Sequence, residues 1–144
     1  MPEAYPDVEG GVRTWLRAQS TITALVGQRV FFGGPKGATE ADFPMIVVQR
    51  IGGGNDMSDA PVDDALVQID CWGKLDASGN GLKAGATALV NTVRSALDDI
   101  RTRTQLAPGV DAFGINVDSV IWAPDPSNDR PRYIVTAEVT AIAS

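Results

Sequence analysis

A stripe of apolar residues in the second half of the chain constrains the fold more than any other feature. Its members recur at intervals of four, three, four, four and three residues: Leu82, Ala86, Leu89, Val93, Leu97 and Ile100. This spacing places them on one face of an α-helix, so we predict a long helix over residues 82–100 with one buried side. Ser78 or Asn80 would cap its start, and Arg101 and Arg103 would complement the negative end of its dipole.

Segments with the two-residue alternation of β-strands lie on both sides of this helix. The predicted strands cover residues 28–32, 45–51, 65–72, 113–122 and 132–142. Two shorter helices precede them. The first begins after Asp7, an expected N-cap, and the second, over residues 21–26, ends at Gly27. The predicted order is therefore α-α-β-β-β-α-β-β.

This order predicts the fold class. Consecutive strands without a helix between them pair as antiparallel hairpins, and the long helix permits one crossover. We therefore predict an α+β fold, an antiparallel or mixed sheet of about five strands with two main helices packed on one face. The opposite face has no predicted cover, and Trp72, Val120, Trp122 and either Ile134 or Ile142 are expected to project there.

Composition favours a single acidic domain that needs no metal or disulfide. The chain has 144 residues with 18 acidic and 12 basic side chains, a formal net charge of −6. A chain of this length buries roughly 70% of its extended surface, so we expect one domain over residues 1–144. No segment has the ~18 apolar residues of a membrane span, and residues 1–7 lack the apolar core of a signal peptide. Synthesis in the cytoplasm is therefore expected.

Residue types that often carry catalysis are missing. There is no histidine, and Cys71 is the one cysteine. This excludes Ser-His-Asp and Cys-His systems, and also His-ligated and four-Cys zinc sites. The alternation over 65–72 places Cys71 on the inward side with Val67 and Ile69, where a cysteine is usually a small buried hydrophobe. The negative balance also argues against binding nucleic acid through its phosphates.

Three motifs resemble ligand sites but lack the required spacing. Residues 33–39 contain glycines, Lys36 and Thr39, but a phosphate loop needs the lysine and hydroxyl adjacent at a helix start. The acids within residues 56–64 do not have the spacing of a calcium-binding loop, and a solvated charge cluster is favoured. Asp98 and Asp99 are helical neighbours and point in different directions. We therefore predict no catalytic, metal-binding or cofactor-binding residue, and no cofactor.

The order of several segments carries a resemblance to a known family. These are residues 23–30 (TALVGQRV), 43–48 (FPMIVV), 67–72 (VQIDCW), the long helix over 82–100, and 132–135 (RYIV). Together they span nearly the whole chain. In this order they are similar to tail terminators, also called tail completion proteins, of long-tailed bacteriophages.

The resemblance implies a structural virion protein that is not an enzyme. Such a protein forms a hexameric ring on the head-proximal end of the tail tube, stops tube polymerisation and provides the head-tail joining surface. The implied partners are other copies of the chain, the tail tube protein and the head-tail connector protein, with no membrane. DNA passes through the lumen without specific binding. We expect the free chain to be monomeric at low concentration and to form its ring on the tube end.

Simple geometry is compatible with such a ring. A chain of this length has a radius of gyration of roughly 15 Å, equivalent to a sphere about 37 Å across. Six such spheres in a closed ring leave a central hole of roughly the same width. Duplex DNA, roughly 20 Å across, would pass through it.

The interface candidates come from one loop and two tryptophans. The loop over residues 52–61 is long for a hairpin connection, and long loops are commonly functional. Two interpretations are equally favoured: the loop becomes ordered when it contacts a partner, or it has no partner. The candidates are Gly52, Asn55, Asp56, Met57, Asp59, Trp72 and Trp122.

Other classes of protein stay open. Another neck or head-completion protein of the same particle would share the size and acidity but bind the connector instead of the tube. A small-ligand-binding or enzymatic domain would need a concave pocket with converging polar groups. A nucleic-acid-binding protein would show an affinity that falls steeply with salt.

Overall fold

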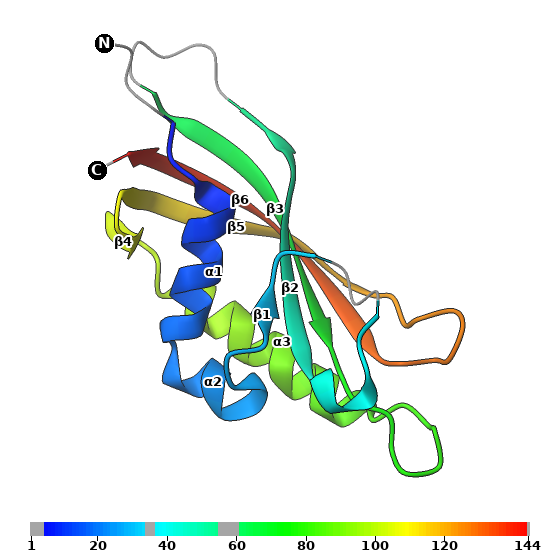
Figure 1. The fold of residues 1–144 in the computed structure, drawn as a ribbon. Coiled ribbons are helices and arrows are strands. Elements are labelled where there is room, and N and C mark those ends of the chain that lie inside the picture. The colour runs from blue at the N-terminus through cyan, green and yellow to red at the C-terminus, as the bar shows by residue number, and fades with distance from the viewer. Residues whose placement is uncertain (1–4, 34–36, 55–60, 144) are drawn as a thin grey trace.

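The computed structural model describes residues 5–33, 37–54 and 61–143. Figure 1 shows these residues as a twisted sheet with helices packed along it. The helices are α1 (Val8–Ala18), α2 (Ser20–Val26) and α3 (Lys83–Asp98), with a short 3-10 helix η1 (Glu40–Asp42). The strands are β1 (Val30–Phe31), β2 (Met45–Gly53), β3 (Asp63–Trp72), β4 (Thr104–Ala107), β5 (Val110–Trp122) and β6 (Arg132–Ala143). The α+β class is confirmed, and the predicted order holds apart from the added strand β4.

The strands form one mixed sheet in the order β1-β2-β3-β6-β5-β4. β1 pairs with β2 in parallel, and the other neighbouring strands are antiparallel. The crossover through α3 takes the chain from β3 in the middle of the sheet to β4 at its edge. β6 then returns between β3 and β5, so the last strand of the chain lies inside the sheet.

β4 is the strand that the alternation pattern did not predict. It forms a hairpin with the first residues of β5, in which Ala107 lies opposite Val110. Gly109 in the turn has a φ of 84°, a left-handed conformation that glycine adopts at little cost. β4 is too short for its alternation to be recognised without its hairpin partner. The hairpin also extends β5 at its start, which lies at Val110, three residues before the predicted 113.

The main core lies between the helices and one face of the sheet. α1 begins at the predicted cap, where the Asp7 carboxylate accepts a hydrogen bond from the Gly10 N–H at 3.0 Å. The predicted stripe of α3 is buried from Ala86 to Ile100, whereas Leu82 precedes the helix and is exposed. Cys71 is fully buried in the same core, as predicted.

The predicted caps of α3 are wrong at its start. No side chain caps this helix, because it begins at Lys83 and the N-cap position is held by Leu82. Ser78 and Asn80 lie in the preceding turn, where their N–H groups donate to the Asp76 carboxylate, both at 2.9 Å. At the other end, Arg101 Nε donates to the Asp98 carbonyl at 2.9 Å, as the dipole argument predicts. Arg103 pairs with Asp111 of β5 at 2.8 Å instead.

The prediction that Trp72 projects from an uncovered face is wrong. Its ring is only 4% exposed and lies edge-on to Phe43, with ring centroids 6.1 Å apart. With Met45 and Val47 these residues form a second, smaller core on the side of the sheet opposite the helices. Residues 39–44, which include η1, cover it. The sequence pattern of one strand could not reveal this cover, because it comes from a loop 30 residues earlier in the chain.

A β-bulge reverses the predicted faces at the end of β5. The register with β6 shifts between Val117 and Ser119, so that Val120 lies opposite Val135 and Trp122 opposite Tyr133. Val135 is buried in the main core and Tyr133 packs against that core, so Val120 and Trp122 lie on the helix side of the sheet. The prediction that they project from the opposite face is therefore wrong. One extra residue in a strand inverts the alternation beyond it.

Candidate functional site

The loop candidates fall mostly outside the described part of the chain. Asn55, Asp56, Met57 and Asp59 lie among residues 55–60, which the structure does not describe. Gly52 belongs to β2, where it pairs with Leu66 of β3 after a register shift. A partner contact at these residues stays a prediction.

The two tryptophan candidates differ in what they can present to a partner. Trp72 is enclosed, and the Arg132 guanidinium lies 4.5 Å from the centroid of its ring. Trp122, at the end of β5, is 40% exposed. Its ring packs against Tyr133 with centroids 5.0 Å apart, and Lys83 Nζ lies 4.6 Å from its centroid. Of these two, Trp122 is the one that offers ring surface for a contact.

The groups that could carry chemistry lie apart from one another or are buried. Burial raises the pKa of the Cys71 thiol, so this residue stays protonated in the core. Burial also raises the pKa of the Asp70 carboxyl, against the opposing effects of Gln68 and Arg132. Within residues 5–33, 37–54 and 61–143, no three metal-ligating side chains form a group that could hold an ion. No described helix has the length and apolarity needed to cross a membrane.

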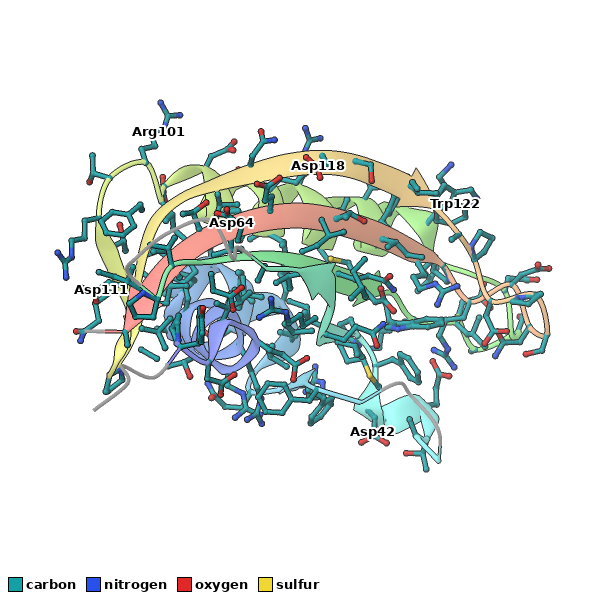
Figure 2. The ribbon with its side chains drawn as sticks, turned by 90° about the horizontal axis from the view of Figure 1, so that it is seen from above. Asp42, Asp64, Arg101, Asp111, Asp118 and Trp122 are labelled. Atoms are coloured by element: carbon teal, nitrogen blue, oxygen red, sulfur yellow. The ribbon has the colours of Figure 1, made fainter. Side chains whose placement is uncertain are left out.

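The long strands carry a hydrophilic surface on the side away from the helices, which we call the polar sheet face. Figure 2 shows β3, β6 and β5 side by side as long arcs, with Asp64 and Asp118 labelled. Pairing across these strands places residues of the same face opposite each other, as Leu66 with Glu138 and Asn116 with Glu138. Its polar part comprises Gln49, Asp64, Leu66, Gln68, Asn116, Asp118, Ser119, Thr136, Glu138 and Thr140, and beyond it the same side carries Ile121 and Ile134.

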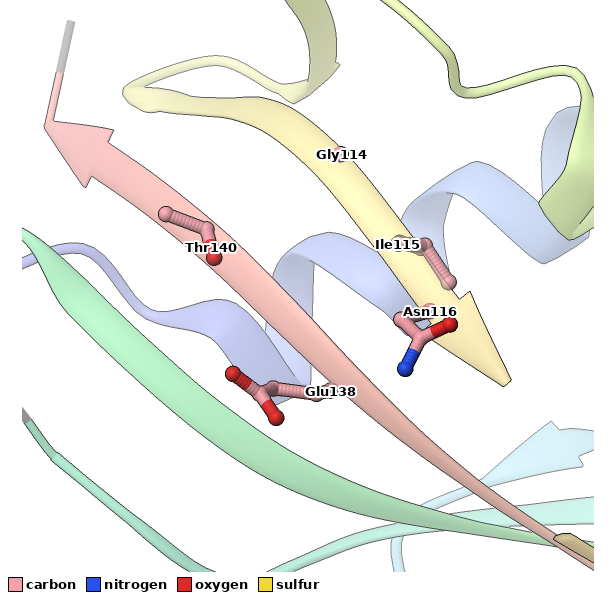
Figure 3. A pocket seen from close by; sticks show the side chains of 5 residues that line it. All are labelled: Gly114, Ile115, Asn116, Glu138 and Thr140. Atoms are coloured by element: carbon pink, nitrogen blue, oxygen red, sulfur yellow. The ribbon is translucent and has the colours of Figure 1, made fainter. Parts of the chain in front are cut away.

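Two shallow hollows lie on the polar sheet face. The first, of about 270 Å³, is lined by Gly114, Ile115 and Asn116 of β5 and by Glu138 and Thr140 of β6. Figure 3 shows that these residues lie along two adjacent strands instead of enclosing a cavity. The second, of about 410 Å³, shares Glu138 and is lined also by Gly53, Gly54, Asp64, Leu66 and Asp118.

The polar sheet face carries uncompensated negative charge. Asp64, Asp118 and Glu138 take part in none of the ion pairs formed by the described residues. Two of them bind neutral groups instead: Asp64 accepts from Thr140 at 2.7 Å, and Asp118 accepts from Asn116 at 3.0 Å. Such a surface repels a polyanion such as DNA.

The described strands leave one edge of the sheet unpaired, which sequence reasoning missed. β5 is paired with β6 along its length, but β4 pairs only with its first three residues, Val110–Ala112. No described strand pairs with residues 114–122 on the other side, and we call this segment the open β5 edge. β5 has 13 residues and its neighbour β4 has four, so β4 can pair with only a part of β5. The sequence could indicate this difference in length only if both strands had been predicted.

Two comparisons with known proteins found a match, one to a family model and one to a solved structure. The family model described as "Tail completion protein gp17" matches residues 10–141. A solved structure titled "Virion of native gene transfer agent (GTA) particle" contains a chain that is similar to this one, with a TM-score of 0.56 and 20% sequence identity. The match covers 94% of this chain and 93% of that chain, and at this identity it shows the fold alone. No curated protein sequence matches the chain significantly.

Proposed function

We propose that this chain, which belongs to the tail completion protein gp17 family, forms a hexameric ring on the head-proximal end of a phage tail tube. Membership of the family makes the chain a structural protein of a phage-like tail or neck. The proposal adds the ring, its position and its two tasks: ending tube polymerisation and providing the surface that joins the head. The observation that carries it is the family match over 132 of 144 residues, from 10 to 141.

The polar sheet face supports a role around a DNA channel. A ring that surrounds passing DNA needs an inner wall that does not hold phosphates. Asp64 and Glu138 give one face of the sheet negative charge that no ion pair of the described residues compensates, and repulsion of like charges keeps DNA from binding to it. In this proposal the polar sheet face lines the lumen, and the helices lie on the outer side of the ring.

The proposed partners follow from the same position. They are further copies of the chain, the tail tube protein on one side and the head-tail connector protein on the other. The protein is then a component of the virion, at the head-proximal end of the tail, and acts through shape and contact instead of catalysis. The free chain is monomeric at low concentration and assembles on the tube end.

Mixing the purified chain with polymerising tail tube protein tests the proposal. We expect the chain to shorten or cap the tubes at amounts well below one per tube subunit, because a single ring is enough to close an end. Images of capped tubes should show the ring at one end. Tubes grown alone, and tubes grown with an unrelated acidic protein of similar size, are the controls.

The second candidate is another neck or head-completion protein of the same particle. Size, acidity and family description are compatible with it. It predicts binding to the isolated connector and no effect on tube length. Tube growth that continues unchanged at equimolar chain, together with connector binding, would favour this candidate over tube termination.

A further inference from the structure

The two edges of the sheet differ in what covers them. At the β1–β2 edge, side chains of α1 take the place of a neighbouring strand. Glu9 accepts a hydrogen bond from the backbone N–H of Arg50 in β2 at 2.7 Å, and Arg13 Nε donates to the backbone carbonyl of Val30 in β1 at 2.9 Å. These side chains therefore use part of the backbone hydrogen-bonding groups that a strand from another molecule would need for pairing.

The open β5 edge has no such cover from a described strand. It extends over residues 114–122, and its apolar side chains are incompletely buried: Ile115, Val117 and Val120 are half-buried at the margin of the main core, and Ile121 is 52% exposed. A long apolar edge strand is a template for pairing with another chain. Natural proteins cover such edges or protect them with bulges and charges. Here the exposed apolar surface beside the bulge, above all Ile121, is what points to a partner.

The bulge in the open β5 edge disfavours pairing of this edge with itself. Asp118 is the extra residue between Val117 and Ser119, and it is exposed. An antiparallel contact between two β5 edges around this bulge would bring two carboxylates together, and like charges directly opposite each other are destabilising. The edge therefore fits a different surface that carries positive charge.

Such a surface lies on the other side of the molecule. Glu9, Arg13 and Arg17 follow at intervals of four along the side of α1 that faces β2 and β1. The first two have backbone partners, whereas Arg17 has none among the described residues, and its Nε is buried without a hydrogen-bond partner. Burial and the nearby Arg13 lower the pKa of Arg17, and the ion pairs among the described residues give this guanidinium no anion.

We propose that neighbouring copies of this chain in the ring join through two different surfaces, the open β5 edge of one copy and the Arg17 side of α1 of the next. The inference rests on the proposed ring and names its contact. A closed ring with cyclic symmetry needs two different patches on each subunit. Glu9 and Arg13, on the same side of α1 as Arg17, bind β2 and β1, which lie at the end of the strand order opposite to β5 and β4. The negative charge of Asp118 in one copy then compensates the positive charge of Arg17 in the next. The contact also buries the part of the apolar β5 side chains that is exposed in the single chain.

Cross-linking between introduced cysteines tests the contact directly. Thr14 is exposed one turn before Arg17, and Ser119 lies in the open β5 edge. The double variant Thr14→Cys/Ser119→Cys is assembled on tail tubes and treated with a bifunctional maleimide. Cys71 is fully buried and does not react in the folded chain, so the wild-type chain is a clean control.

We expect a ladder of dimers, trimers and larger species from the double variant and none from Thr14→Cys alone. A ladder requires two different patches, because a contact of one patch with itself stops at the dimer. Dimers from Ser119→Cys alone, without a ladder from the double variant, would mean that the edge pairs with itself and would overturn the inference. The absence of cross-links on tubes that the chain has capped would overturn it as well.

Charge reversal supplies a second, independent readout. Asp118→Arg and Arg17→Glu should each weaken assembly of the chain about tenfold, and the double variant should recover most of that loss. Lys74→Glu, outside both surfaces, is the matched control and should leave assembly unchanged. Thermal unfolding of each variant separates a lost contact from a lost fold. Folded single variants that assemble like the wild type would contradict the contact.

The two proposals fail in different ways. If the chain caps tubes but gives no ladder, the proposed function stands and the named contact is wrong. If the chain does not cap tubes but concentrated protein alone gives a ladder, the contact stands and the tube-terminating function is wrong.

Discussion

Gly11 lies where α1 crosses the β4–β5 hairpin, and replacing it with alanine should loosen this crossing. A Cβ atom built at Gly11 would lie 2.8 Å from Val110 Cγ1 and 3.4 Å from Leu106 Cβ. Both neighbours are at least 96% buried, and the branched side chain of valine has little rotamer freedom. The helix must therefore move away from the hairpin to accept the methyl group.

The matched control is Gly85→Ala in α3, where the added Cβ has no heavy atom within 4 Å apart from its chain neighbours and the backbone of its own helix. In a helix, Gly→Ala alone stabilises by about 0.8–1.0 kcal/mol. We expect at most that gain at Gly85, which lies in the first turn of α3, whereas at Gly11 overpacking costs about 1–3 kcal/mol and offsets it. The difference in unfolding free energy between the two variants, about 1–3 kcal/mol, therefore measures the packing cost at Gly11.

Urea denaturation and thermal unfolding measure this difference. For a chain of this size, 1 kcal/mol corresponds to a shift in Tm of about 3–5 °C, so Gly11→Ala should melt several degrees below Gly85→Ala. Circular dichroism should show unchanged helix content in both variants before unfolding. A Gly11→Ala variant as stable as Gly85→Ala would refute the packing of α1 against the hairpin.

Three further predictions concern the core, a cap and an ion pair. Leu89→Asp should leave the chain unfolded in circular dichroism, because it buries an unpaired charge; a folded variant would contradict the assignment of α3. Asp7→Ala should lower the unfolding free energy by about 1 kcal/mol in urea titrations by removing the acceptor of the Gly10 N–H, and no loss would contradict the cap. Hydrogen bonding by Arg130 lowers the pKa of the Glu40 carboxyl, so its stabilisation is present above pH 4.5 and is lost as pH falls through the lowered pKa. Glu40→Gln should therefore flatten the pH dependence of Tm in acid, and an unchanged acid limb would contradict this role.

Features that depend on the immediate sequence neighbourhood were predictable. The four-and-three spacing along α3 placed its buried face correctly from Ala86 to Ile100, and Asp7 and Gly27 gave the start of α1 and the end of α2. The alternation over β3 placed Cys71 inward. Each of these signals arises from backbone geometry within a few residues, which the side-chain pattern must follow.

The candidate surfaces were less predictable, because they depend on which segments meet. Trp72 would be exposed on β3 alone, and it is buried because residues 39–44 fold over it. Trp122 changes sides because a bulge adds one residue to β5, a choice made by pairing with β6. Arg17 can be seen in the sequence as a like-charged neighbour of Arg13, but its missing partner cannot.

The chain by itself therefore determined the helices, most strands, the acidic charge balance and the family to which it is similar. Only the tertiary structure decided that β6 lies between β3 and β5, that one edge is capped by α1, and that the other is open over residues 114–122. The physical reason is that periodicity records whether a side chain faces a core, whereas the free edges of a sheet depend on which strands pair across long stretches of sequence.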